Sequence, residues 1–167
     1  MGITPRFKQS DILKETQKGL RTIENGIIRI LQYGGEKFVK DARDENTYID
    51  QTGNLRSSIG YFILKDGKVI DSMIYLSAKG TDRQTGLETG KLFAGTLPKS
   101  SGYQLIGVAG MDYASSVESK GYNVITLQKD VCLVKIETDL NRFKTRMNAK
   151  DSSVDFDIND LVLTATR

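Results

Sequence analysis

The residue types on which most enzyme chemistry depends are scarce in this chain of 167 residues. Histidine is absent, and cysteine occurs once, at Cys132. These counts exclude an imidazole general base, a histidine-rich metal site, a Cys/His dyad and an intrachain disulfide. Cys132 lies in the apolar run Val-Cys-Leu-Val. We therefore expect a buried core residue rather than a reactive thiol, which would need exposure and nearby positive charge.

Two acidic clusters are the remaining candidates for metal chemistry. Their members are Asp41, Asp44 and Glu45 in the first cluster and Asp155, Asp157 and Asp160 in the second. Asp-x-Asp spacing can bind a hard cation, but the second cluster lacks the glycine and the glutamate that complete an EF-hand loop. We interpret both clusters as solvated acidic faces, and we predict no metal site.

Four glycines between residues 80 and 95 do not form a phosphate-binding loop. Gly80, Gly86, Gly90 and Gly95 are too widely spaced for a nucleotide fingerprint. Gly90 and Lys91 are followed by leucine, where a phosphate-binding loop needs serine or threonine. We therefore predict no cofactor, no small-molecule substrate and no enzymatic activity.

The net charge of +3 is unevenly distributed. Residues 121–150 carry six basic and three acidic side chains, whereas residues 151–167 carry one basic and four acidic side chains. Opposite charges in one chain favour contact between copies, because each patch is complementary to a patch on a neighbour. A nucleic-acid-binding accessory protein that uses Arg142, Lys144 and Arg146 is the alternative. These residues lack interleaved exposed aromatics, so we expect weak nonspecific binding at most.

The hydropathy pattern predicts neither membrane insertion nor export. No window approaches the ~18 consecutive apolar residues of a membrane span. Residues 1–10 lack the apolar region of a secretory signal. We expect a protein that is cytosolic where it is made.

Two helices are predicted from apolar residues spaced three and four apart. The first is a long N-terminal helix that begins near Asp11 and is kinked at Gly34-Gly35. The second covers residues 130–147. Its inward face is either Val131, Val134 and Thr138 or Leu133, Ile136, Leu140, Phe143 and Met147.

The strand predictions follow from β-prone runs and turn residues. Residues 57–64 and 69–76 flank an Asp-Gly turn and predict a hairpin. Residues 103–111 predict a third strand, and the weak alternation over residues 154–164 predicts a strand-like arm. The expected fold class is α+β, with a mainly antiparallel sheet of about four strands packed against the two helices. We expect a single domain over residues 1–150 and an acidic C-terminal arm over residues 151–167.

A long inserted loop is predicted over residues 79–102, with a short helix within it at 87–97. It carries a small apolar set, namely Leu87, Leu92, Phe93 and Leu97. Such a segment buries little apolar surface alone, so we expect it to be an assembly element that orders only beside a partner.

Two short motifs are expected to stabilise turns. In the first, Thr52 or Asn54 caps a turn, Gly53 lets the chain reverse, and Leu55 anchors it. Arg56 is left to bind a carboxylate, and Ser58 completes this motif. In the second, Tyr113 and Val117 face inward, and Gly121 ends the turn that also holds Ala114 and Glu118. We expect Arg56 and Glu118 to pair.

The same segments carry a family resemblance. Residues 50–59, Asp-Gln-Thr-Gly-Asn-Leu-Arg-Ser-Ser-Ile, resemble a "DTGNLRSSI" signature, and residues 110–121 resemble a "YAxxVExG" signature. In this order they are similar to tail-completion or neck (head-tail joining) proteins of tailed phages, including the lambdoid "gp-ten-like" morphogenesis and minor tail proteins. The chain departs from the family pattern after Gly121, where Tyr122 to Thr126 replace a Pro-Phe-Leu-type segment.

This resemblance implies a structural protein of a virion or prophage rather than an enzyme. Its partners would be further copies of itself, in a ring at the head-tail junction, and neighbouring tail or head-connector proteins. It would reside in the host cytoplasm during assembly and in the virion tail or neck afterwards.

Overall fold

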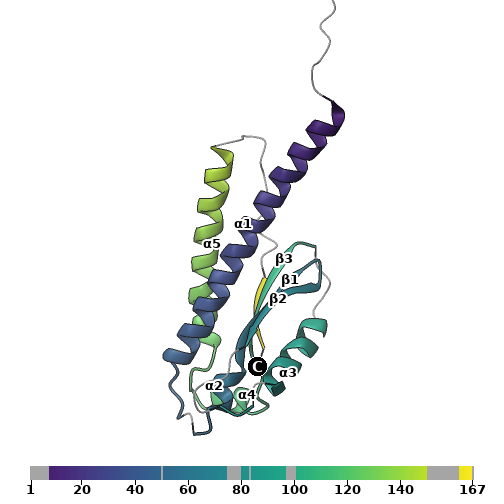
Figure 1. The fold of residues 1–167 in the computed structure, drawn as a ribbon. Coiled ribbons are helices and arrows are strands. Elements are labelled where there is room, and N and C mark those ends of the chain that lie inside the picture. Colours follow the sequence, from purple (N-terminus) through teal and green to yellow (C-terminus); the bar gives the residue numbers. More distant parts are fainter. Residues whose placement is uncertain are drawn as a thin grey trace, which may run out of the picture.

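The structure, a computed structural model, describes residues 8–49, 51–74, 80–82, 84–96, 101–149 and 162–166. The helices are α1 (Gln9–Asp44), α2 (Asn54–Ser58), α3 (Gln84–Thr96), α4 (Ala114–Ser119) and α5 (Thr126–Asn148). The strands are β1 (Ile59–Lys65), β2 (Lys68–Ile74), β3 (Tyr103–Ala109) and β4 (Val162–Thr166). The fold is therefore α+β, with a long N-terminal helix and a C-terminal helix as predicted (Figure 1).

The sheet has the strand order β2-β1-β3-β4. β1 is antiparallel to both β2 and β3, whereas β4 is parallel to β3. The antiparallel part thus has three strands, and β4 comes from the segment that the sequence predicts to be a separate arm. Residues 150–161 of that segment lie outside the described residues. The predicted hairpin is present, with Asp66 and Gly67 at φ values of 52° and 72° in its turn.

One face of the sheet is covered by α1 and α5. Leu31, Phe38 and Val39 of α1 and Ile136 of α5 are almost fully buried in this core. α1 passes through Gly34-Gly35 without interruption, and the glycines permit close packing instead of breaking the helix. A Cβ at Gly35 would lie 2.6 Å from the Tyr61 ring, and one at Gly34 would lie 2.5 Å from Ile136.

The two inward faces proposed for the last helix are now distinguishable. Cys132, Ile136 and Leu140 of α5 are buried, whereas Val131 and Val134 are 55% and 64% exposed. The face with Ile136 and Leu140 therefore packs inward, and the alternative with Val131 and Val134 is wrong. Cys132 is only 6% exposed, which confirms its predicted core position. Burial raises the pKa of its thiol to about 12.

The other face of the sheet is covered by α3. Leu87 and Phe93 of α3 pack on the buried cluster of Phe62, Leu64, Ile74, Ile106 and Val108. The short helix predicted at 87–97 is thus present as α3, and it begins three residues earlier than predicted. Because α3 packs on the sheet, it is a helix of the domain, which corrects the prediction of a long inserted loop. β1 and β3 are buried at almost every position, so both faces of the sheet need a cover.

The packing of α3 on the sheet argues against the prediction that residues 79–102 order only beside a partner. Of the apolar set in this segment, Leu92 is 73% exposed, and Leu97 lies outside the described residues.

Candidate functional site: a groove between the two sequence motifs

The first motif forms α2 and the turn before it. Gly53 has a φ of 75°, which confirms that a glycine is needed where the chain reverses. The Thr52 hydroxyl accepts a hydrogen bond from the Asn54 amide at 3.3 Å. The Asn54 side chain in turn accepts from the amides of Thr81 and Asp82, at 2.9 and 3.2 Å. This turn therefore ties the chain before α3 to α2, with Leu55 buried beneath it.

The serines of α2 stabilise the helix itself. The buried Ser57 hydroxyl donates to the Gly53 carbonyl at 2.6 Å, and the buried Ser58 hydroxyl donates to the Leu55 carbonyl at 2.8 Å. A Cβ at Gly86 of α3 would lie 2.7 Å from the Ser58 Cα. Ser58 is therefore also the point at which α3 approaches α2.

Two arginines join the end of α1 to this motif. Arg56 Nη2 donates to the Arg43 carbonyl at 2.6 Å, and Arg43 Nη2 donates to the Ile59 carbonyl at 3.0 Å. Burial, together with the nearby Arg56 charge, lowers the pKa of Arg43. The guanidinium of Arg56 thus binds a carbonyl at the C-terminal end of a helix, where cations are favoured.

The second motif forms α4. Ala114 is buried, Val117 packs against the core, and Gly121, with a φ of 84°, ends the turn. Tyr113 is 44% exposed, so the prediction that it faces inward is wrong. Its ring belongs to the surface of the molecule at this end of the sheet.

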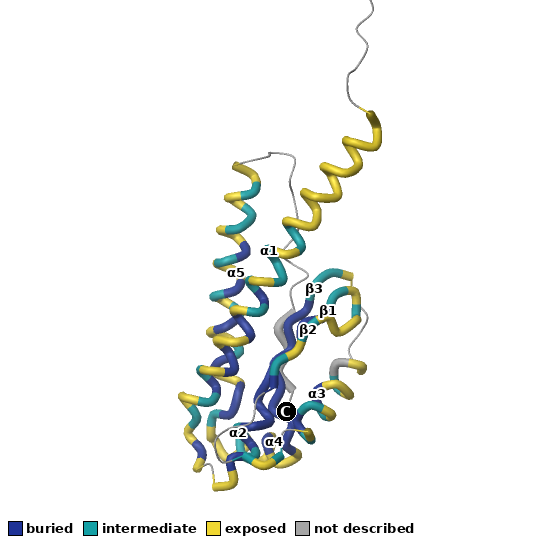
Figure 2. Tube along the Cα trace, in the orientation of Figure 1, coloured by how far each residue is buried: buried dark blue, intermediate teal, exposed yellow. Residues whose placement is uncertain are grey.

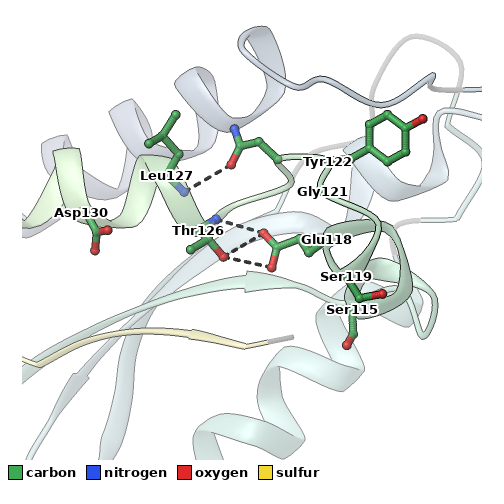
Figure 3. Close-up of a pocket in the computed structure, with 9 residues that line it drawn as sticks. Ser115, Glu118, Ser119, Gly121, Tyr122, Thr126, Leu127 and Asp130 are labelled. Carbon is green, nitrogen blue, oxygen red and sulfur yellow. Dashed lines mark hydrogen bonds between the residues drawn. The ribbon is translucent and has the colours of Figure 1, made fainter.

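Glu118 holds α4 to the start of α5 (Figure 3). Its Oε1 accepts hydrogen bonds from the amides of Ile125 and Thr126 at 2.9 and 3.0 Å, and both of its oxygens accept from the Thr126 hydroxyl at 2.9 Å. Burial acts to raise the pKa of Glu118, but these hydrogen bonds outweigh it and leave the pKa below its ordinary value. The predicted pair of Arg56 and Glu118 is wrong, because Glu118 binds the amino end of α5 and Arg56 binds the carboxyl end of α1.

A hollow of about 520 Å³ surrounds this cap (Figure 3). Its lining residues are Ser115, Glu118, Ser119, Gly121, Tyr122, Asn123, Thr126, Leu127 and Asp130. Asn123 is engaged as well, because it accepts from the Leu127 amide at 3.2 Å and donates to Gln128 at 2.8 Å. Glu118 and Asn123 therefore act in this hollow as helix-capping groups.

A second groove, of about 420 Å³, lies between the two motifs. Its lining residues are Tyr48, Ile49, Gln51, Thr52, Asn54, Leu55, Met111, Tyr113 and Val117. Ile49 is 88% exposed, and the Thr52 hydroxyl and the Asn54 side-chain oxygen already accept hydrogen bonds. We call this surface the motif groove. Exposed apolar surface of this kind marks sites of protein interaction or ligand binding.

Several structural residues carry no signal in the sequence. Arg43 donates a hydrogen bond to a backbone carbonyl, a partner that no residue type reveals. Asn123 caps α5, which the sequence predicts to begin later, at residue 130. No three His, Cys, Asp or Glu side chains gather into a metal-binding group among the residues whose positions are described. Within that same part of the chain, no helix combines the length and apolar character of a membrane span.

Comparisons with protein-family models, curated proteins and solved structures find no match for this chain.

Proposed function

We propose that the protein is a structural component of a tailed phage or prophage, a tail-completion or neck protein that oligomerises at the head-tail junction. The observation that carries the proposal is the convergence of the two motifs. They are more than 50 residues apart in the chain, yet they line one groove at one end of the sheet. This convergence supports the resemblance of both segments, in that order, to the phage family.

The chemistry of the groove supports an assembly role rather than an enzymatic one. Thr52, Arg56 and Glu118 of the two motifs bind backbone groups at turns or helix ends, and the thiol of Cys132 is buried. Ile49 and Tyr113 leave apolar surface exposed beside them. We therefore propose that the partners are copies of this chain and neighbouring tail or head-connector proteins, and that the protein acts without a cofactor or small-molecule substrate.

Complementation of a phage or prophage that lacks this protein tests the role of the motif groove. We expect Ile49→Asp to fold normally but to fail to restore infectious particles, because a charge in the groove opposes burial against a partner. The matched control is Ile70→Asp, which changes an exposed apolar residue of β2 away from the groove. Full complementation by Ile49→Asp would contradict the role proposed for the groove.

The alternative, a nucleic-acid-binding accessory protein, is favoured by one feature of the α1–α5 seam. A hollow of about 320 Å³ is lined by Gly26, Arg29, Ile30, Tyr33, Asp139, Arg142, Phe143 and Arg146. Its single carboxylate, Asp139, is already bound by Lys135 at 2.6 Å. Arg142 also lies 3.5 Å from this carboxylate. Three arginines and Lys135 therefore share one carboxylate, which leaves excess positive charge beside the exposed Tyr33.

A fluorescence titration with random duplex DNA separates the two functions. The assembly role predicts weak binding that falls steeply with salt, because only phosphate contacts contribute. Tight binding that survives physiological salt and is lost in Arg142→Gln would favour the alternative.

A further inference from the structure

The hollow in the α1–α5 seam, which we call the seam hollow, lies where the two helices approach each other closely. α5 runs alongside α1 in this part of the molecule (Figure 2). A Cβ at Gly26 of α1 would overlap the Phe143 ring of α5, so the glycine permits this approach. The approach brings side chains of both helices around one hollow of about 320 Å³.

The charges that line the seam hollow are unbalanced. The described residues of its lining include Arg29 of α1, Arg142 and Arg146 of α5, and a single carboxylate, that of Asp139. Three positive charges against one negative charge give the lining a net charge of +2. A concave lining of one sign of charge favours a ligand of the opposite sign.

Asp139 is already engaged by its own helix. The Lys135 ammonium donates to its two oxygens at 2.8 and 2.6 Å, and Arg142 Nη1 lies 3.5 Å from its Oδ1. Arg29 and Arg146 form no ion pair within the described part of the chain. The positive charge that Asp139 leaves unbalanced therefore lies mainly on these two arginines, one from each helix.

The arrangement of the three arginines is unfavourable by itself. Arg142 and Arg146 are four residues apart on α5, a spacing at which like charges destabilise a helix. Arg29 adds a third like charge from α1. An anion bound among them would offset this repulsion and accept charge-assisted hydrogen bonds, because the planar fork of N–H groups on arginine matches the oxygens of phosphate.

We propose that the seam hollow binds a dianionic phosphate group, which Arg29 holds from α1 and Arg142 and Arg146 hold from α5. The net charge of the lining matches that of a phosphomonoester at pH 7, which is about −1.5 to −2. Tyr33 also lines the hollow, and a tyrosine hydroxyl can donate to phosphate. A volume of about 320 Å³ is at the lower end for small-molecule sites, which favours a compact anion over a nucleic-acid strand.

The bound phosphate group would join α1 to α5, and it would be neither a substrate nor a cofactor. Its source is either free inorganic phosphate or a small phosphomonoester, because both present the same oxygens to the arginines. The inference goes beyond the proposed function and does not depend on the phage role.

Thermal unfolding of the full-length chain in rising concentrations of inorganic phosphate tests this site, with sodium chloride used to keep the ionic strength constant. Because a ligand of the folded state raises Tm with its concentration, we expect a rise that fits a dissociation constant of about 1 mM. Arg29→Gln and Arg146→Gln should each weaken binding about tenfold, since each removes a charge-assisted hydrogen bond.

The matched control is Arg21→Gln, which changes an exposed arginine of α1 outside the lining and should bind phosphate like wild type. General stabilisation by phosphate acts on every variant alike, so the difference between Arg29→Gln and this control isolates the site. Asp139→Asn gives a result that misfolding cannot imitate. It removes the carboxylate that competes with phosphate for Arg142, so binding should become about threefold tighter.

Three results would overturn the site: an equal rise of Tm in every variant, equal weakening in Arg21→Gln, or no tightening in Asp139→Asn. Glycerol 3-phosphate in place of inorganic phosphate identifies the source. Tighter binding than that of inorganic phosphate assigns the site to a phosphomonoester, and weaker binding assigns it to free phosphate. Tighter binding of random duplex DNA than of either anion, at equal phosphate concentration, would also overturn the proposal and favour the nucleic-acid alternative. The readout uses purified protein alone, so its failure differs from failure of the phage role, which is measured by particle assembly.

Discussion

Glu118 illustrates how one carboxylate stabilises a helix from outside it. It accepts hydrogen bonds from the two residues at the start of α5, and its pKa is lowered by those bonds in spite of burial. Ionisation therefore favours the folded state. Its contribution is fully present above the ordinary pKa of glutamate, about 4.3, and is lost as the pH falls through the lowered value of the folded protein.

We expect Glu118→Gln to lower the free energy of unfolding at pH 7 by about 1 kcal/mol, the usual value of a helix cap. The difference from wild type should shrink as the pH is lowered below about 4. Urea unfolding at a series of pH values measures both effects. The control is Glu36→Gln, an exposed glutamate of α1, and an equal loss in that variant would contradict the capping role.

At the scale of elements, α1 shows how the surroundings of a glycine decide whether its replacement by alanine raises or lowers stability. A Cβ at Gly19 would meet nothing within 4 Å, whereas a Cβ at Gly35 would lie 2.6 Å from the Tyr61 ring. We expect Gly19→Ala to stabilise the protein by roughly 0.5–1 kcal/mol through helix propensity. Gly35→Ala should destabilise it by about 1–3 kcal/mol through overpacking.

Thermal unfolding of these two variants provides the measurement. Similar shifts in both, in either direction, would show that α1 does not approach β1 as closely as described.

α3 yields a second prediction at this scale. Phe93 packs on the cluster of Phe62 and Val108, whereas Leu92, its neighbour in sequence, is 73% exposed. Phe93→Ala should lower the free energy of unfolding by about 2–3 kcal/mol, less than for a fully buried phenylalanine. Leu92→Ala should change it by less than about 0.5 kcal/mol. Equal effects in chemical denaturation would indicate that α3 is not part of the folded core.

The elements that could be predicted are those with strong local signals. The three-and-four spacing of apolar residues predicts α1, and Asp66-Gly67 predicts the hairpin. α3 is harder to predict in full, because its glycines and threonines have low helix propensity and its position depends on packing over the sheet. The parallel pairing of β4 with β3 joins segments far apart in the chain, and no local pattern encodes such a partner.

The same distinction applies to the candidate site. Gly53 and Gly121 can be predicted as turn residues because positive φ values favour glycine. The partners of Arg56 and Glu118 could not be predicted, because backbone groups at helix ends carry no residue signature. The exposure of Tyr113 likewise depends on how α4 is oriented against the first motif.

On the scale of the whole molecule, two exposed surfaces lie toward opposite ends of α1. The motif groove is lined by residues that follow the carboxyl end of α1, and the exposed apolar side chains of Ile12, Leu13 and Leu20 lie in its amino-terminal half. Figure 1 shows these two ends of α1 far apart. A protein with separate exposed surfaces can bind copies of itself through one and a different partner through another. Separate surfaces of this kind are what the proposed head-tail joining role requires.

Negative-stain electron microscopy of particles made without this protein tests the central claim most directly. Under the proposed function the gene belongs to a phage or prophage. That phage or prophage is induced with the gene deleted, and the lysate is compared with one in which the wild-type gene is restored. A head-tail joining role predicts filled heads and separate tails in the deletion, and joined particles after restoration. Intact, infectious particles in the deletion lysate would contradict the account.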